Sequence, residues 1–235
     1  MQRELRALHG DATRPYLKGG FYPYFFARGK LGIDPIFYAM LRTGAIPSGA
    51  RILDLGCGQF LLASLLLAAR RQFEAGNWPA GWPEPPVPGS LTGIELDPAR
   101  ANWARKALGE RVSVRTADLG GVDLPDADVV LLFDVLHYLG DAGQVALLEK
   151  IAHSLRGGGK LLMRVADAEA GWRFKLTRIV DHSTLLMRGR LSGSFFCRTI
   201  GDWSTLLLRH GFRIERQPMS QGTPFANILL TASRY

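Results

Sequence analysis

Short apolar runs alternate with helical patterns through the middle of the chain. A continuous apolar run bounded by turn residues predicts a buried strand. The run at residues 127–135 is nearly all apolar, as expected for a strand covered on both faces. On this basis we predict five strands, at residues 51–56, 91–96, 111–117, 127–135 and 160–166.

Helical patterns fill the intervals between these strands. We predict an apolar helix at residues 59–71 and a second helix opening at Asp97, which suits the N-cap, with Pro98 in the first helical position. A third helix is predicted at residues 141–155, with the glycines of residues 157–159 ending it as a C-cap turn. Strands that alternate with helices imply right-handed crossovers and a parallel sheet.

The alternation of predicted strands and helices ends after Asp167. Residues 169–190 predict a helical insertion, and residues 202–210 predict a helix stopped by Gly211. Two strands follow, at residues 212–218 and 226–233, with a spacing typical of an antiparallel hairpin. We therefore predict an α/β fold whose mostly parallel sheet ends in an antiparallel hairpin.

Two segments lie outside the alternation. Residues 1–48 contain an aromatic run at 21–26 and are predicted to form an N-terminal lid or substrate segment. Residues 49–235 then form the main domain, with a helical insertion at 168–198 over the substrate site. The prolines of residues 76–90 exclude a helix or central strand there. This insertion is interpreted as a homodimer contact, a lid edge or an inert loop.

The composition is that of a globular protein. The chain has 235 residues, 47% of them hydrophobic and 21% charged, which suits one domain of generous size. Its longest apolar run, residues 60–69, is too short to cross a bilayer, and its first residues lack the apolar stretch of a secretory signal. Cys57 and Cys197 make no disulfide framework, so we expect a reducing, cytoplasmic setting.

The formal charge of +8 is unevenly distributed. Residues 1–30 and residues 164–198, which include Arg173 and Lys175, are each about four charges positive by a simple count of side chains. One interpretation is that these are solvated helix faces. The other is that they form a rim attracting an acidic substrate or partner.

A glycine-rich turn, Asp54-Leu55-Gly56-Cys57-Gly58, follows the first predicted strand. Glycines let the backbone turn tightly and approach a ligand closely. The helix after the turn offers N–H groups and the positive end of its dipole to an anion. A phosphate fits that description, and so does the carboxylate of an amino acid. The turn alone therefore indicates either a nucleotide or an amino-acid-like cofactor.

Acidic residues end the next two predicted strands. A carboxylate at Glu95 can accept from both ribose hydroxyls, as in dinucleotide folds, and Asp118 is placed to accept from an adenine amino group. The dinucleotide fingerprint G-x-G-x-x-G/A would need a small residue at position 61, where the chain has Leu61. A Rossmann oxidoreductase is therefore disfavoured.

In this order the motifs resemble those of the class I S-adenosylmethionine (SAM)-dependent methyltransferases. The match covers about residues 50–167. A short motif gains weight when its structural context and companion motifs are present. Beyond the turn, Glu95 and Asp118-Leu119, it includes Phe133-Asp134-Val135-Leu136-His137-Tyr138-Leu139 and Leu155-Arg156-Gly157-Gly158-Gly159-Lys160-Leu161. The fold implied is Rossmann-like, with a seven-stranded sheet.

The resemblance also implies roles for individual residues. SAM would be the cofactor, S-adenosylhomocysteine the product, and no metal would take part. Leu96 packs on adenine or belongs to the core, and Cys57 is more typical of a small filler than of a nucleophile. The implied cofactor residues are Asp54, Leu55, Gly56, Cys57 and Gly58 for the methionine end, Glu95 and Leu96 for ribose and adenine, Asp118 and Leu119 for the adenine edge, and Asp134 near the sulfonium.

The candidate base is His137, just past the fourth predicted strand. Its ordinary pKa near neutrality suits proton removal from an acceptor. The alternative is that His137 caps the turn or packs on Tyr138, which is itself a candidate pocket residue beside Asp134. Arg164 and Asp167 either touch substrate or form a strand-end salt bridge. Either Arg28 or Lys30 is a further candidate for pairing with the methionine carboxylate.

Two classes of methyl acceptor are considered, nucleic acid and small molecules. The positive charge suggests nucleic acid, but the fourth motif reads Asp134-Val135-Leu136-His137 rather than the Asn/Asp-Pro-Pro-aromatic motif of enzymes that methylate base amino groups. Aromatic and basic flanking segments favour a small aromatic or acyl acid, free or bound to an acyl carrier protein. The chain also resembles the methyltransferases of bacterial aryl-polyene pathways. The non-enzymatic alternative is a protein that binds SAM without turning it over and acts as a partner of another protein.

We expect Asp54→Ala and Glu95→Ala each to weaken SAM binding by about 1–3 kcal/mol, because each leaves polar groups of the ligand without partners. Isothermal titration calorimetry measures the loss directly. Wild-type affinity in both variants would contradict the site assignment.

Overall fold

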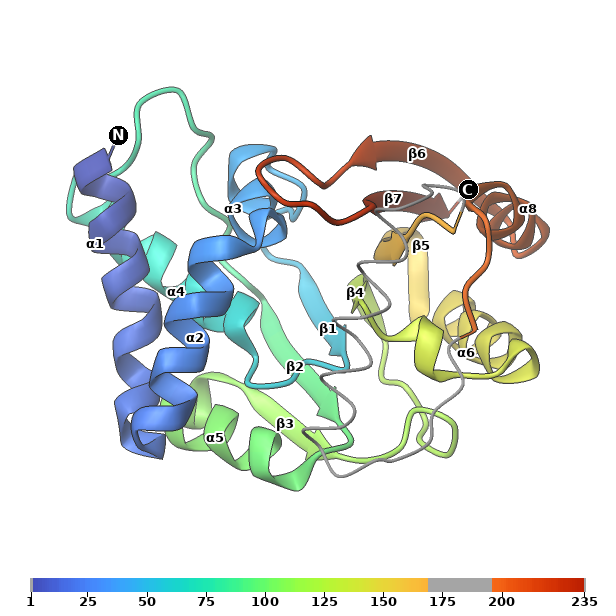
Figure 1. Ribbon diagram of the computed structural model, residues 1–235, viewed down its shortest axis with the longest axis horizontal. Coiled ribbons are helices and arrows are strands. Elements are labelled where there is room, and N and C mark those ends of the chain that lie inside the picture. Colours follow the sequence, from blue (N-terminus) through green and yellow to red (C-terminus); the bar gives the residue numbers. More distant parts are fainter. Residues whose placement is uncertain (1, 169–195, 235) are drawn as a thin grey trace. The chain divides into compact units, whose positions relative to one another are not determined.

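The structure, a computed structural model, describes residues 2–168 and 196–234. The chain falls into two compact units, residues 1–122 and residues 123–235 (Figure 1). The predicted helical insertion at 169–190 and the basic residues Arg173 and Lys175 lie outside the described residues.

The first unit contains three parallel strands with helices packed around them. Strand β2 pairs with β1 on one side and β3 on the other. These strands confirm the first three strand predictions to within two residues at either end. Their bounds are β1 Arg51–Leu55, β2 Ser90–Glu95 and β3 Ser113–Thr116. The helices are α1 Gln2–Thr13, α2 Phe21–Ile33, α3 Pro35–Arg42, α4 Leu61–Glu74 and α5 Pro98–Leu108, with 3-10 turns η1 Arg14–Gly19 and η2 Gly109–Arg111.

Residues 2–42 form helices that the apolar pattern did not reveal. Helix α4 is buried along most of its length, and α1 packs against it. Ser64 of α4 donates to the carbonyl of Ala12 at 2.6 Å. A helix that is apolar nearly all round needs cover on more than one side. The N-terminal helices supply that cover for α4 within the first unit.

The insertion at residues 76–90 is an irregular loop, as predicted. Its two tryptophan rings pack edge-to-face, with centroids 5.8 Å apart, and Trp78 also packs on Phe73 of α4. The indole nitrogen of Trp78 donates to the carbonyl of Pro83 at 2.9 Å. These contacts give the loop a small apolar cluster of its own against α4.

The second unit contains four strands in the order β4-β5-β7-β6. Strands β4 and β5 are parallel, while β7 runs antiparallel to both β5 and β6, so the predicted C-terminal hairpin is confirmed. The strands are β4 Ala127–Phe133, β5 Leu155–Ala166, β6 Phe212–Pro218 and β7 Asn227–Arg234. The helices are α6 Asp141–Ser154 and α8 Ile200–Arg209, with the 3-10 turn η3 Leu136–Tyr138.

Two helix ends differ from the sequence expectation. The glycines at 157–159 do not cap α6, because the chain turns extended at Leu155 and these glycines lie inside β5. A Cβ at Gly159 would lie 2.8 Å from the carbonyl oxygen of Arg156, so close backbone approach explains the glycine there. Helix α8 begins at Ile200 rather than at Asp202, because Thr199 and Asp202 form a reciprocal capping box.

We expect Gly93→Ala to lower the free energy of unfolding by about 1–3 kcal/mol, because overpacking a filled core forces its neighbours to move. A Cβ at Gly93 would lie 2.6 Å from Sγ of Cys57 and 3.1 Å from the ring of Phe60. Urea denaturation measures the loss.

The control for this substitution is Gly29→Ala. A Cβ at Gly29, in helix α2, would meet no atom within 4 Å. This variant should match or exceed wild-type stability, since alanine favours helix. Equal stability of the Gly93 and Gly29 variants would contradict the packing argument.

Candidate functional site

The glycine-rich turn connects β1 to α4 in a conformation that favours glycine. Gly56 and Gly58 have positive φ angles of 73° and 57°. The amides of Gly56 and Cys57 donate to the carbonyl of Ile94, at 2.8 and 3.1 Å. These amides are therefore engaged inside the fold, whereas the first N–H groups of a helix such as α4 have no partner within the helix.

Glu95 and the glycine turn are brought together by the pairing of β1 with β2. One carboxylate oxygen of Glu95 accepts from the amide of Gly58 at 2.7 Å, and the other accepts from the amide of Asp97 at 2.8 Å. A carboxylate has about four acceptor positions, so two are left to receive hydroxyl donors. The predicted ribose acid thus also fixes the turn.

Asp54, the last but one residue of β1, has a buried carboxyl group that is only 6% exposed. No hydrogen bond to that carboxyl forms within the described part of the chain. Burial, with a smaller contribution from the charge of Glu95, raises the pKa of Asp54 to about 7. A buried acid of this kind is stabilised in its ionised form by a cationic ligand. The ammonium and sulfonium groups of SAM are such cations, so these residues fit that cofactor.

The remaining predicted cofactor residues of the first unit differ in exposure. Leu96 is 48% exposed, which rules out the alternative that it belongs to the core. Asp118 is exposed and accepts from the amide of Gly120 at 2.9 Å, and Leu119 is half-buried. Arg28 is exposed on α2, where its guanidinium lies 5.6 Å from the ring centroid of Tyr24.

Cys57 behaves as a packing residue. Its thiol is buried, and burial raises the pKa of Cys57 well above its ordinary value. The thiolate is the reactive form of cysteine, so a raised pKa argues against a nucleophile. A Cβ at Gly93 of β2 would lie 2.6 Å from the sulfur of Cys57, so the missing side chain of this glycine leaves room for the thiol.

Two further residues, which the sequence pattern does not mark as site residues, support the turn. Phe60 is fully buried and has a left-handed backbone with φ 58° and ψ 46° just before α4. Non-glycine residues in that region cost roughly 1–3 kcal/mol and persist where surrounding structure enforces them. Tyr16 of η1 is also fully buried, and its hydroxyl donates to the carbonyl of Gln59 at 2.8 Å. Nothing in the pattern of residues 1–48 singles out Tyr16.

In the second unit, Asp134 follows the end of β4 with a positive φ of 58°. Arg164 of β5 is only 2% exposed and donates to both carboxylate oxygens of Asp134, with its Nε at 2.9 Å. Bidentate pairing of this kind fixes both position and orientation of a carboxylate. The strand-end salt bridge expected for Arg164 therefore exists, but its partner is Asp134.

His137 and Tyr138 lie together in the 3-10 turn η3, and both are half-buried. Their ring centroids are 4.1 Å apart, so the predicted packing of the two rings is present. The carbonyl of His137 accepts from the amide of Phe196 at 3.0 Å. The turn is thus held from its backbone. A role for His137 as base stays a prediction.

Across residues 2–168 and 196–234, no group of three or more His, Cys, Asp or Glu side chains is arranged to hold a metal ion. The helices of the same residues include none with the length and apolar character of a membrane span.

The chain matches a family model and several curated proteins. Residues 96–213 match the family described as O-methyltransferase domain. A carboxy-S-adenosyl-L-methionine synthase of Aliivibrio fischeri is 46% identical over 161 residues, covering 66% of this chain and 61% of that protein. The corresponding synthase of Chromohalobacter salexigens is 31% identical over 120 residues, covering 49% and 39%. The chain thus spans roughly half the length of these relatives.

Solved structures share the fold. Magnesium protoporphyrin IX methyltransferase of Synechocystis, with bound SAH, covers 99% of this chain and 94% of its own length with a TM-score of 0.59 at 17% identity. A mitomycin 7-O-methyltransferase covers 93% and 60%, with a TM-score of 0.60 at 22% identity. The predicted Rossmann-like class I methyltransferase fold, with its seven-stranded, mostly parallel sheet and antiparallel C-terminal strands, is confirmed.

The raised pKa of Asp54 predicts that SAM binding depends on pH. Below pH about 7 the carboxyl of the ligand-free protein is protonated and neutral. A cationic ligand favours the ionised carboxylate, so binding should release a proton. Affinity should rise by up to about tenfold per pH unit as the pH approaches 7, and level off above it. Calorimetry in buffers of different ionisation enthalpy measures both the affinity and the proton release.

The control is Asp54→Asn, which keeps the shape of the side chain and cannot ionise. This variant should bind SAM more weakly at high pH and lose the proton release. Equal proton release by the variant and the wild type would assign the titration to another group and contradict the role of Asp54.

Proposed function

This chain belongs to the O-methyltransferase domain family, and we propose that it transfers the methyl group of SAM to a small-molecule acceptor. The observation that carries this proposal is the pair formed by the buried, hydrogen-bond-poor Asp54 and the Glu95 carboxylate that holds the glycine turn. Together they offer negative charge and hydroxyl acceptors to one ligand carrying a cation and a ribose.

The cofactor supplies an activated methyl group on a sulfonium, and the protein aligns it and excludes water. In our proposal Asp54 neutralises positive charge at the methionine end, and the free acceptor positions of Glu95 receive the ribose hydroxyls. Leu96, exposed beside Glu95, packs against adenine. Asp118 and Leu119 receive the adenine edge. Arg28 pairs with the methionine carboxylate.

The proposed base is His137, with Tyr138 as a neighbouring pocket residue. Neutral imidazole takes a proton from the acceptor as the methyl group arrives, which suits a hydroxyl or amine acceptor. In our proposal Asp134, whose carboxylate is held by the bidentate guanidinium of Arg164, lies on the sulfonium side of the cofactor. These roles rest on the position of the residues after β4 and in η3.

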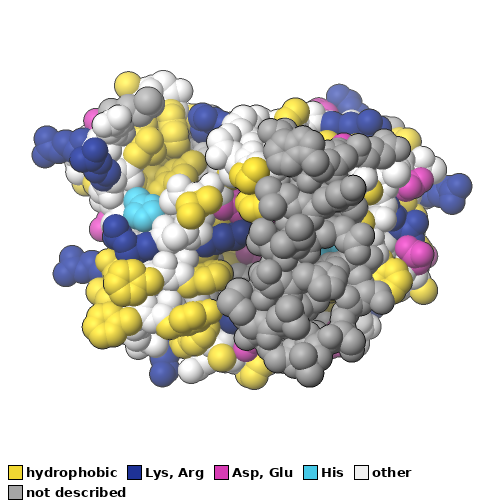
Figure 2. Space-filling model, viewed as in Figure 1, with side chains coloured by type: hydrophobic (Ala, Val, Ile, Leu, Met, Phe, Trp, Pro, Cys, Tyr) yellow, Lys and Arg dark blue, Asp and Glu magenta, His cyan; other side chains and the backbone are white. Residues whose placement is uncertain are grey.

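An aromatic or acyl acid is the acceptor class that the surface of the first unit supports. Figure 2 shows hydrophobic side chains gathered over the start of α2. Phe21, Tyr22 and Phe25 of this helix are 76%, 65% and 62% exposed. Lys18 and Arg28 are exposed on the same stretch of chain. Aromatic rings next to cations suit an acidic aromatic compound, free or attached to an acyl carrier protein.

A second candidate is the formation of a modified cofactor. The observation in its favour is the 46% identity to a carboxy-S-adenosyl-L-methionine synthase over 161 residues. In that case SAM itself would be the substrate, and the product would be a SAM derivative carrying an additional carboxyl group. Mass spectrometry of the small molecules after incubation with SAM and metabolite extract separates the two candidates.

The test of the proposed function uses methyl-labelled SAM with purified aromatic acids, their carrier-bound forms and cell extract. Label recovered in an acceptor, with stoichiometric S-adenosylhomocysteine, supports methyl transfer. A carboxylated SAM derivative supports the second candidate. SAM binding without either product would favour a cofactor-binding partner protein, and label in RNA would favour the nucleic-acid alternative.

We expect His137→Gln to lower kcat for methyl transfer by roughly 10²–10⁴-fold, the usual contribution of a general base. The SAM dissociation constant should stay within about twofold, since glutamine preserves the polarity of the turn. Rapid-quench kinetics with the labelled cofactor measures the chemical step.

The matched control for this substitution is His153→Gln, which replaces an exposed histidine of α6 whose Nδ1 donates to the carbonyl of Glu149 at 2.7 Å. It should leave kcat unchanged. A His137 variant with wild-type kcat at all pH values would remove this residue from the chemistry.

A further inference from the structure

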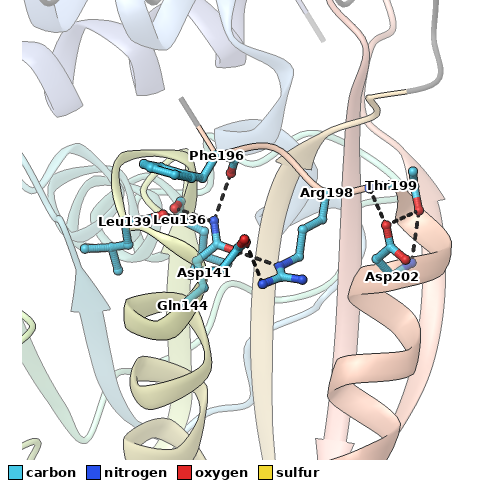
Figure 3. A network of polar contacts seen from close by, with 8 residues as sticks. All are labelled: Leu136, Leu139, Asp141, Gln144, Phe196, Arg198, Thr199 and Asp202. Carbon is cyan, nitrogen blue, oxygen red and sulfur yellow. Dashed lines mark hydrogen bonds and ion pairs between the residues drawn. The ribbon is translucent and has the colours of Figure 1, made fainter. Parts of the chain in front are cut away.

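A glutamine buried in helix α6 is the centre of a polar cluster in the second unit (Figure 3). The side chain of Gln144 is fully buried. Its amide nitrogen lies 3.1 Å from the carbonyl oxygens of Leu136 and Leu139 and 2.8 Å from that of Phe196. Its own oxygen accepts from Nε of Arg198 at 2.7 Å. The two hydrogens of the amide are shared among these three carbonyls, so both ends of the amide are satisfied, as a buried polar group requires.

The cluster joins two segments that are far apart in sequence. The carbonyls of Leu136 and Leu139 flank His137 and Tyr138, so the Gln144 amide holds the turn η3 at both of its ends. The same amide holds the carbonyl of Phe196, whose N–H donates to the carbonyl of His137 at 3.0 Å. The His137 turn and the chain at residue 196 are therefore fixed against each other from two sides.

Arg198 completes the cluster on its solvent side. Its guanidinium forms an ion pair with Asp141 at 2.7 Å, and it lies 5.7 Å from the ring centroid of Trp203 in α8. The capping box of Thr199 and Asp202 starts α8 immediately afterwards. Arg198 thus orients the amide of Gln144 and connects it to the first residues of the next helix.

Gln144 supplies hydrogen-bond partners to backbone carbonyls of two segments that lack regular backbone pairing. A leucine at position 144 would fill an apolar helix face, whereas glutamine requires every one of its polar atoms to be matched. Gln144 instead supplies hydrogens to carbonyls of an irregular turn and of an extended segment. Rigid support of this kind is what a catalytic side chain needs in order to keep a productive orientation.

We propose that Gln144 and Arg198 are positioning residues that hold the His137 turn against Phe196 and so set the orientation of His137 during methyl transfer. This inference rests on the proposed function of the chain. Neither residue touches the reacting atoms. Their effect passes through the backbone of η3, which they fix by the hydrogen bonds described.

The test compares Gln144→Leu and Arg198→Lys with wild type. Gln144→Leu removes the donors and the acceptor at similar volume, while Arg198→Lys keeps the charge and loses the guanidinium geometry. We expect Gln144→Leu to lower kcat about a hundredfold, because small misplacements of catalytic groups cost that much. Arg198→Lys should lower kcat by less. SAM affinity, measured by calorimetry, should change less than about twofold in both variants.

Ser154→Ala is the matched control. Ser154 lies in the same helix, is buried, and donates to the carbonyl of Pro125 at 2.6 Å. Its loss removes one buried side-chain hydrogen bond to a carbonyl at the far end of α6 from η3. Thermal melting should show a comparable loss of stability in Ser154→Ala, whose kcat should remain that of wild type.

Two further measurements separate positioning from general destabilisation. The pH profile of kcat/KM should shift its acid limb in Gln144→Leu, because the surroundings of His137 change. Amide exchange followed by NMR should show faster exchange at Phe196 in this variant and not in Ser154→Ala. If Gln144→Leu fails to fold, Arg198→Lys serves for all of these measurements.

The outcomes distinguish the two claims. Wild-type kcat and wild-type pH profiles in the folded Gln144 and Arg198 variants of an active enzyme would overturn the positioning role and leave the proposed function intact. An equal loss of kcat in Ser154→Ala would also overturn it, since the effect would then follow stability. A wild-type protein that binds SAM and methylates no acceptor would overturn the proposed function, and the positioning role with it.

Discussion

The hydrogen bond from the amide of Gly58 to the carboxylate of Glu95 joins the ends of two parallel strands of the first unit. It adds a side-chain anchor to a turn whose glycines have positive φ and whose Gly56 and Cys57 amides donate to the carbonyl of Ile94. The same carboxylate holds the amide of Asp97, the N-cap of α5. One side chain therefore links the turn after β1 to the start of α5.

The charge of Glu95 has a further effect on Asp54. Both acids belong to neighbouring strands, and burial of Asp54 is the larger cause of its raised pKa. Protein interiors tolerate a buried carboxyl group when it is neutral or when a cation compensates it. The first unit therefore contains an acid that is costly to ionise alone and that a cationic ligand would relieve.

Unusual backbone conformations gather at the same kind of position in both units. Phe60 and Asp134 are the non-glycine residues with positive φ in the described chain; Asp134 directly follows β4, and Phe60 lies at the end of the connection from β1 to α4. Strain of this kind requires support, which Phe60 finds in its complete burial and Asp134 in the bidentate guanidinium of Arg164. Regular strands and helices thus hold irregular residues where a ligand is expected.

Most element positions follow from local sequence. The apolar runs predict the strands because a buried strand needs continuous apolar residues, and Asp97-Pro98 predicts the start of α5 because an N-cap acts on its own backbone. The glycines at 157–159 predict a helix C-cap but lie in a strand, since glycine permits both a helix C-cap and close backbone approach in a strand. Only the packing around Gly159 distinguishes these two uses.

The sequence by itself determined the class of fold, the cofactor motifs and the candidates Asp54, Glu95 and His137, because each depends on residue type and on spacing along the chain. Only the tertiary structure decided which groups meet. Arg164 pairs with Asp134, Tyr16 holds the carbonyl of Gln59, and Gln144 joins η3 to Phe196. Each of these contacts spans tens of residues, and hydrogen bonds depend on distance and direction in space, which no local pattern records.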